Sequence, residues 1–220
     1  MKLSILDLAH VPAGSNVGQA LRNTLDLARH ADGLGYTRFW LAEHHNMPGI
    51  ASAATSVVIG QVAAVTQRIR VGAGGIMLPN HAPLVIAEQF GTLEALYPGR
   101  IDLGLGRAPG GDRLTASILN PSNTFNPKEY VQQIVDLKGY LSEEHEKGSV
   151  LEKVRAIPRI TTEPALWMLT SSGESAYIAA HFGMALSFAQ FINPAGGPEA
   201  IQAYRQQFKP SNQLQKPQAS

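Results

Sequence analysis

The sequence predicts an α/β protein built on a parallel sheet. Six short apolar segments alternate with six longer amphipathic segments along the 220 residues, and each amphipathic segment is long enough to carry the chain back across a sheet. Hydrophobic residues make up 44% and charged residues 16%, as in an ordinary globular protein. The residues alone leave a doubly wound sheet and a barrel as alternatives, although the first strand-helix turn lacks the G-x-G-x-x-G pattern of dinucleotide binding.

The predicted strands are short runs of apolar residues. They are Leu3–Leu8, Phe39–Ala42, Ile69–Ile76, Ile101–Leu105, Ala165–Leu169 and Ala185–Phe188. The predicted helices show apolar residues at helical spacing. They are Val17–Leu34, Ser52–Thr66, Leu84–Leu96, Pro127–Ser142, Ser175–His181 and Pro198–Phe208.

Two segments do not fit this alternation. The stretch Ala108–Asn126 is polar and rich in Gly, Pro and Asn, so we predict a long loop there. Residues 209–220 are polar and contain two prolines, and we expect this tail to fray. The sequence therefore predicts one domain over residues 1–208, followed by a polar tail over residues 209–220.

Charge and composition exclude several classes of partner. A net charge of +1 disfavours nucleic acids and polybasic attachment to membranes, because both need clustered cations. Cysteine is absent from the sequence, which excludes disulfides and thiol nucleophiles and is typical of a cytoplasmic protein. We see neither a signal peptide nor an apolar run of the roughly 18 residues that a spanning helix needs. A small-molecule ligand is the remaining expectation.

Polar and glycine residues follow four of the predicted strands. Parallel strands end on one face of the sheet, where α/β proteins bind their ligands. The residues that gather there are Glu43, His44, His45, Asn46, Gly74, Gly75, Pro79, Asn80, His81, Gly106, Arg107, Gly110, Gly111, Ser171, Ser172, Gly173 and Ser175.

Glu43, His44 and His45 are three adjacent titratable residues at one of these strand ends. Histidine commonly transfers protons near neutral pH. A zinc site is an alternative, but adjacent side chains on an extended backbone point to opposite faces, which disfavours one metal held by both histidines. A structural role, in which one histidine caps a helix and the other binds a buried carbonyl, is also open.

Gly72, Gly74 and Gly75 interrupt the third predicted strand. Glycine within a strand marks a bulge or the close approach of a ligand, so a flat ring can lie against this bare backbone. Tight packing against a neighbouring helix would explain the same glycines.

Arg107, Ser172, Gly173 and Ser175 lie just past the fourth and fifth predicted strands. An arginine among flexible residues suits a phosphate or carboxylate. The start of a helix offers unpaired N–H groups and a favourable dipole to an anion. A surface salt bridge for the arginine and ordinary helix capping by serine are the alternatives.

Five motifs in order resemble the bacterial luciferase-like flavin monooxygenase family. They are FWLAEHHN (39–46), VGAGGIMLP (71–79), AEQ (87–89), YPGRIDLGLGRAPGG (97–111) and WMLTSS (167–172), and the likeness spans about residues 1–217. The resemblance implies a TIM-type (β/α) barrel, incomplete here with about six βα units. It also implies an enzyme that takes reduced FMN from a separate flavin reductase and uses O2 to oxidise a small organic substrate such as an aldehyde.

The same resemblance implies roles for individual residues. His44 matches the catalytic histidine of the family, with Glu43 and His45 beside it. Gly74 and Gly75 match the position next to the isoalloxazine ring, where the family often has a cis peptide bond. The remaining cofactor-binding residues, at the phosphate, are Arg107, Ser172, Gly173 and Ser175. No metal is implied.

The resemblance also implies that this chain is shortened at its C-terminus, because it ends soon after Lys216 and Pro217, before strands seven and eight. Six strands leave two sheet edges unpaired, so we expect a homo-oligomer or another closing element. A non-catalytic FMN-binding protein or an inactive shortened family member is therefore the alternative to an active monooxygenase.

Overall fold

Six parallel strands form one sheet in the computed structural model, which describes residues 2–124, 126–142 and 147–220. Consecutive strands are neighbours throughout, in the order β1-β2-β3-β4-β5-β6. They span Ser4–Asp7 (β1), Arg38–Leu41 (β2), Arg70–Met77 (β3), Ile101–Gly106 (β4), Ala165–Thr170 (β5) and Ala185–Phe188 (β6). All six predicted strands are confirmed.

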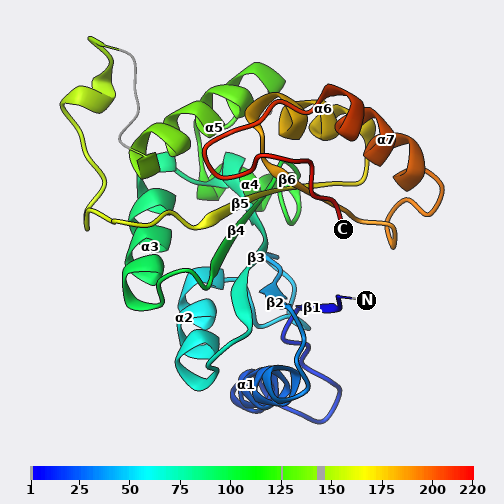
Figure 1. Cartoon of the computed structure of the whole chain (residues 1–220). Helices are drawn as coiled ribbons and strands as arrows, with labels where there is room; N and C mark the ends of the chain where they lie inside the picture. Colours follow the sequence, from blue (N-terminus) through cyan, green and yellow to red (C-terminus); the bar gives the residue numbers. More distant parts are fainter. Residues whose placement is uncertain (1, 125, 143–146) are drawn as a thin grey trace.

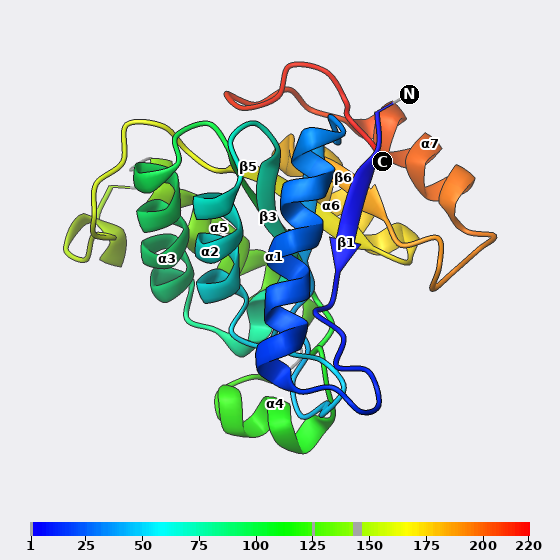
Figure 2. The ribbon, with the colours of Figure 1, turned by 90° about the horizontal axis from the view of Figure 1, so that it is seen from below.

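Apart from α4 (Arg113–Leu119), which Figure 2 shows beyond one end of the sheet, the helices lie on the outside of this sheet, as Figure 1 shows. They span Val17–Gly33 (α1), Thr55–Val65 (α2), Pro83–Leu96 (α3), Arg113–Leu119 (α4), Pro127–Ser142 (α5), Gly173–Phe182 (α6) and Gly197–Gln207 (α7), with 3-10 turns at Leu78–Asn80 (η1) and Val150–Glu152 (η2). The sheet curls so that it makes part of a TIM-type barrel, open on the side where the two chain ends lie (Figure 1). The predicted incomplete barrel is confirmed.

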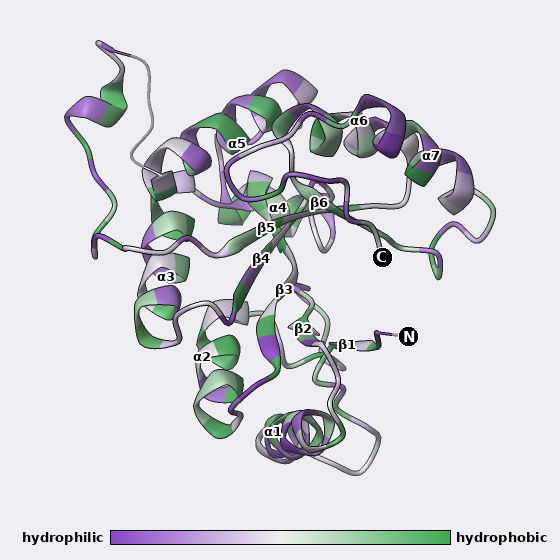
Figure 3. Ribbon diagram, in the orientation of Figure 1, coloured by the Kyte–Doolittle hydropathy of each residue, from purple (hydrophilic) through white to green (hydrophobic). Residues whose placement is uncertain are grey.

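The core lies between the sheet and the helices around it. Strand β4 is buried along its whole length, and β3 is buried except at its two ends. On α5, Tyr130, Ile134 and Leu137 are buried at intervals of about one turn and join the same apolar cluster as the strands. Hydrophobic and hydrophilic residues accordingly occur on the same helices in Figure 3.

A buried ionic cluster ties together the first residues of β2, β3 and β4. Asp102 is fully buried and lies 2.9 Å from Nε of Arg38 and 2.7 Å from Nη2 of Arg70. Nε1 of Trp40 donates a hydrogen bond of 2.9 Å to the same carboxylate. The charge of Asp102 is thus paired at the end of the sheet opposite to the predicted ligand face.

The prediction of a continuous loop over Ala108–Asn126 is wrong, because α4 lies within this stretch. Asp112 caps α4, since its Oδ1 accepts a hydrogen bond of 2.9 Å from the backbone N–H of Thr115. Residue 125, inside the predicted loop, lies outside the described residues.

The prediction that the C-terminal tail frays is also wrong. The backbone N–H of Leu186 donates to the carbonyl of Gln218 at 2.9 Å, and Ser220 exchanges hydrogen bonds with Leu186 and Phe188. The tail therefore pairs with the outer edge of β6, and Figure 2 shows the chain end near β6 and the N-terminus. Among the described residues, β1 remains the uncovered edge.

None of the helices in the described part of the chain has both the length and the apolar character that a membrane crossing requires.

Candidate functional site

A cavity of about 450 Å³ lies where the strands end at their carboxyl sides. Its wall contains five of the nine predicted site residues, and these come from within β3 and from the segments that follow β2, β4 and β5. They are His44, Gly74, Arg107, Ser172 and Ser175. The parallel sheet has therefore brought together side chains that are far apart in the sequence.

The cavity also has an apolar part that the sequence reasoning missed. Phe191 and Ile192 follow β6 and are 75% and 64% exposed, and both line the cavity. Leu6 and Leu169 contribute from β1 and β5. The sequence could have indicated this apolar part, because two large apolar residues soon after a predicted strand lie at the same face as the other strand ends.

His44 is the predicted proton-handling residue that reaches this cavity. Its Nδ1 atom is buried and has no hydrogen-bond partner among the described residues. Burial lowers the pKa of His44 below its ordinary value of 6.5, although the charge of Glu43 opposes this effect. A neutral imidazole at pH 7 can accept a proton or a hydrogen bond from a ligand in the cavity.

Glu43 and His45 do not line the cavity but meet His81 on another side of the strand ends. Oε1 of Glu43 lies 2.6 Å from Nε2 of His45 and 2.8 Å from Nε2 of His81, and Oε2 accepts a hydrogen bond of 2.8 Å from the backbone N–H of Met77. Burial alone would raise the pKa of Glu43, but the contacts with His81, His45 and Met77 outweigh it and hold the pKa below 4.5.

The cluster of Glu43, His45 and His81 is of the kind that can hold a metal ion, since its three ligand atoms lie within 4.8 Å of one another. The sequence suggested only the adjacent pair His44 and His45 as metal ligands. The structure instead closes the cluster by direct hydrogen bonds between the carboxylate and both imidazoles.

The glycines of β3 make close contacts with neighbouring strands. The peptide bond between Gly74 and Gly75 is cis, as the resemblance implies. A Cβ atom on Gly74 would lie 2.8 Å from Cδ1 of Leu6, and one on Gly75 would lie 2.8 Å from the carbonyl oxygen of Gly104. Only Gly74 of this pair lines the cavity, and these nearest contacts come from strands, not from the helix that the alternative interpretation required.

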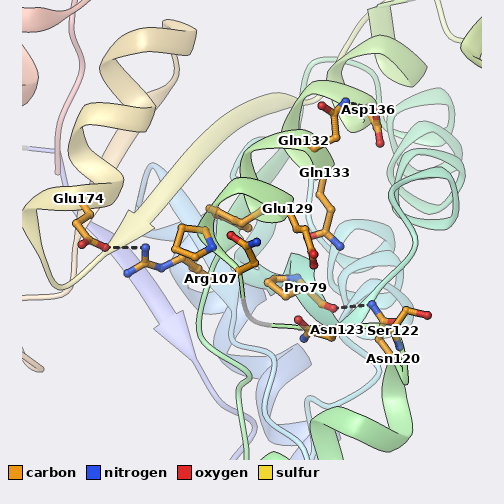
Figure 4. A pocket seen from close by; sticks show the side chains of 13 residues that line it. Pro79, Arg107, Asn120, Ser122, Asn123, Glu129, Gln132, Gln133, Asp136 and Glu174 are labelled. Carbon is orange, nitrogen blue, oxygen red and sulfur yellow. Dashed lines mark hydrogen bonds and ion pairs between the residues drawn. The ribbon is translucent and has the colours of Figure 1, made fainter. Parts of the chain in front are cut away.

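Arg107 forms the surface ion pair that was the alternative to a phosphate site. Its Nη1 atom lies 2.7 Å from Oε2 of Glu174, and these side chains are 35% and 71% exposed. Figure 4 shows this pair at one side of a second pocket, which Arg107 lines together with Glu174. Arg107 therefore borders two hollows at once.

The start of α6 supplies the other predicted anion-binding residues. Ser172 is the N-cap residue, but its side chain makes no capping hydrogen bond in the described structure. Ser175 is buried in the first turn and lines the cavity, whereas Gly173 does not line it. A Cβ atom on Gly173 would meet no atom within 4 Å, so space lies beside this helix terminus.

A family model described as luciferase-like monooxygenase matches residues 1–213 of the chain. The chain belongs to the luciferase-like monooxygenase family. It is 50% identical over 217 residues to the uncharacterized protein YvbT of Bacillus subtilis and 48% identical over 216 residues to a luciferase-like monooxygenase of Escherichia coli. These alignments cover 99% and 98% of this luciferase-like chain but 63% of each relative, so it spans less than two thirds of their length.

Solved structures of the luciferase-like fold agree with this assignment. The structure of apo-MsnO8 is 38% identical and has a TM-score of 0.91, covering 99% of this chain and 64% of MsnO8. Two more distant structures share the fold alone. One is the oxygenating constituent of 3,6-diketocamphane monooxygenase in complex with FMN (17% identity, TM-score 0.70), and the other is an F420-dependent secondary alcohol dehydrogenase (16%, 0.72).

Proposed function

We propose that this chain supplies the flavin site of an FMN-dependent monooxygenase, which takes reduced FMN from a separate reductase and oxidises a small organic substrate with O2. The observation that carries the proposal is the shared cavity, in which His44, Gly74 and Arg107 lie with two serines of α6. An aldehyde is the substrate class we propose, and we expect a cytoplasmic homo-oligomer.

The residues present fit a flavin mononucleotide. The cavity volume of about 450 Å³ is within the range of about 300–1,000 Å³ that is common for small-molecule sites. One end offers Arg107, Ser172, Ser175 and the first N–H groups of α6 to a phosphate. The other side offers the bare backbone of Gly74 and the apolar side chains of Leu6 and Leu169 to a flat ring.

Each of these residues has a distinct part in the proposed reaction. Reduced FMN, when bound, supplies the electrons that activate O2. His44 lines the cavity, and burial lowers its pKa, so its imidazole is neutral near pH 7 and can accept a proton from the substrate or the cofactor. The apolar wall of Phe191 and Ile192 provides contact surface for an organic substrate and displaces water.

FMN is favoured over F420 by the charges beside Arg107. The pocket beyond Arg107 is lined by the carboxylates of Glu129, Asp136 and Glu174. Among its described lining residues, Arg107 is the only cation. A ligand that continues past its phosphate with further negative charges would meet these carboxylates. FMN ends at the phosphate and so avoids them.

Binding and turnover test the proposal separately. Titration of the purified chain with FMN should quench flavin fluorescence at micromolar concentrations. With an added flavin reductase, NADH and O2, the protein should form a carboxylic acid from at least one member of a panel of aldehydes. His44→Asn should keep FMN binding and lose aldehyde oxidation.

The outcomes distinguish this proposal from the alternatives. FMN binding without oxidation of any aldehyde would support a non-catalytic FMN-binding protein. If FMN causes no quenching up to tens of micromolar, the chain is an inactive family member and the proposed function is wrong.

A further inference from the structure

The ion pair of Arg107 and Glu174 lies on the border between two hollows. Arg107 lines the cavity at the strand ends, and it also lines a polar pocket of about 550 Å³ that lies over α5 (Figure 4). Glu174 lines only the polar pocket. A ligand phosphate beside Arg107 would therefore lie close to the Glu174 carboxylate and point toward a space large enough for further groups.

This polar pocket has an excess of negative charge. Its charged residues, within the described part of the chain, are the cation Arg107 and the carboxylates Glu129, Asp136 and Glu174. Glu129 accepts a hydrogen bond from Thr124, and Asp136 accepts one from Gln132. Both of these hydrogen bonds come from neutral donors, so they orient the two carboxylates without neutralising them.

The remaining lining is neutral, so it does not offset this charge, and it includes Pro79, Pro127 and Tyr130. Carboxamide groups from Asn120, Asn123, Gln132 and Gln133 form much of it. Figure 4 shows Glu129, Gln133 and Asn123 among the side chains that line this pocket with Arg107. Carboxamide groups can hydrogen-bond to the polar groups of a ligand, and the pocket is large enough to admit them. The pocket therefore selects between ligands by their charge.

We propose that Glu174 is a specificity-determining residue, which restricts the flavin site to ligands whose negative charge ends at the phosphate beside Arg107. This inference rests on the proposed flavin site. Glu174 repels the ligand phosphate moderately and competes with it for Arg107. A second phosphate, placed farther into the pocket, would meet Glu174, Glu129 and Asp136 without a second cation to offset them.

Glu174 can be replaced without damage to the fold. Its side chain is 71% exposed, and an ion pair at such a position contributes little to stability. Glu199 provides a matched control, because it also lies exposed in the first turn of a helix, α7, and does not line either hollow. Glu199→Gln therefore makes the same change in net charge and in helix-dipole interaction.

The test compares three flavins with equal rings. Dissociation constants of riboflavin, FMN and FAD are measured by fluorescence quenching for the unmodified chain, Glu174→Gln and Glu199→Gln. Glu174→Gln should tighten FMN by roughly 2- to 5-fold, as expected for one exposed charge, should tighten FAD by a larger factor, and should leave riboflavin unchanged. The gain in affinity should shrink as salt is raised from 0.05 to 0.5 M, because the Debye length then falls from about 14 to about 4 Å and the charge is screened.

A second variant locates the effect in the pocket. Asp136→Asn should tighten FAD and leave FMN unchanged, since only FAD extends beyond Arg107. An FMN-to-FAD affinity ratio that is the same in the unmodified chain and in Glu174→Gln, or that Glu199→Gln changes equally, overturns the inference while the flavin site stands. Failure of all three flavins to bind would overturn the proposed function as well.

Discussion

Nε2 of His81 lies 2.8 Å from Oε1 of Glu43, so a side chain that follows β3 is fixed to one that follows β2. The other carboxylate oxygen of Glu43 holds the backbone N–H of Met77 at the end of β3. Because Glu43 precedes His44 directly, this connection sets where His44 enters the cavity. Glu43 therefore connects these strand ends from outside the cavity, and the catalytic role predicted for it stays a prediction.

Glu43→Gln should destabilise the fold by about 1–3 kcal/mol, because the amide cannot accept all three hydrogen bonds that the carboxylate accepts. The free energy of unfolding in urea measures this loss. Glu152→Gln, at an exposed position on η2, should change it by less than about 0.5 kcal/mol. Equal losses in the two variants would contradict the role of Glu43 as a connection between strands.

Acid should destabilise the protein in two stages. The pKa of His44 is lowered by burial, so the unfolded chain takes up its proton first and stability falls as the pH drops below 6.5. The pKa of Glu43 is also lowered, so its contribution is complete above pH 4.5 and is lost as the pH falls further through the native pKa. Urea midpoints measured from pH 7.5 down to about pH 3 should therefore fall first below pH 6.5 and again below pH 4.5.

Two variants assign these stages to their residues. His44→Asn should flatten the stability profile just below pH 6.5, and Glu43→Gln should flatten it below pH 4.5. If both variants keep the slope of the unmodified chain throughout, other groups cause the acid sensitivity.

Gly104→Ala should be strongly destabilising, by about 3 kcal/mol or more, because a Cβ atom there would lie 2.2 Å from the carbonyl oxygen of Ala73. Both groups are parts of paired strands, and neither can shift without breaking the ladder between β3 and β4. Gly33→Ala is the control, since a Cβ atom at this helix end meets nothing within 4 Å and should be neutral or slightly stabilising. Similar thermal midpoints for the two variants would show that the β3–β4 spacing is adjustable.

The alternation of apolar and amphipathic segments predicted every strand and every long helix, because each element is long enough to show its own period. Helix α4 was missed because the average polarity of residues 108–126 hid a local capping signal, Asp112 followed by Thr115. The pairing of the tail was missed for another reason. Its hydrogen bonds use backbone groups of Gln218 and Ser220, and they leave no apolar pattern in the sequence.

The sequence predicted those parts of the candidate site that depend only on the order and direction of the strands. Strand ends share one face, and His44, Gly74 and Arg107 do meet there. His44 lines the cavity, whereas Glu43 and His45 on either side of it do not. The alternation of side chains along an extended backbone predicts this difference from the sequence. The partnership of Glu43 with His81 and that of Arg107 with Glu174 join different βα units, so only the folded chain reveals them.

Ser220→Pro should loosen the edge of β6, because proline removes the N–H group that donates to the carbonyl of Leu186 at 3.0 Å. The hydrogen bonds from Leu186 to Gln218 and from Phe188 to Ser220 depend on the same pairing, so we expect faster amide exchange at both β6 residues. Ala219→Pro is the control, since the N–H of Ala219 has no backbone acceptor among the described residues and the chain there is already extended. If the control accelerates exchange at Leu186 as much as Ser220→Pro does, the tail does not stabilise β6 through this ladder.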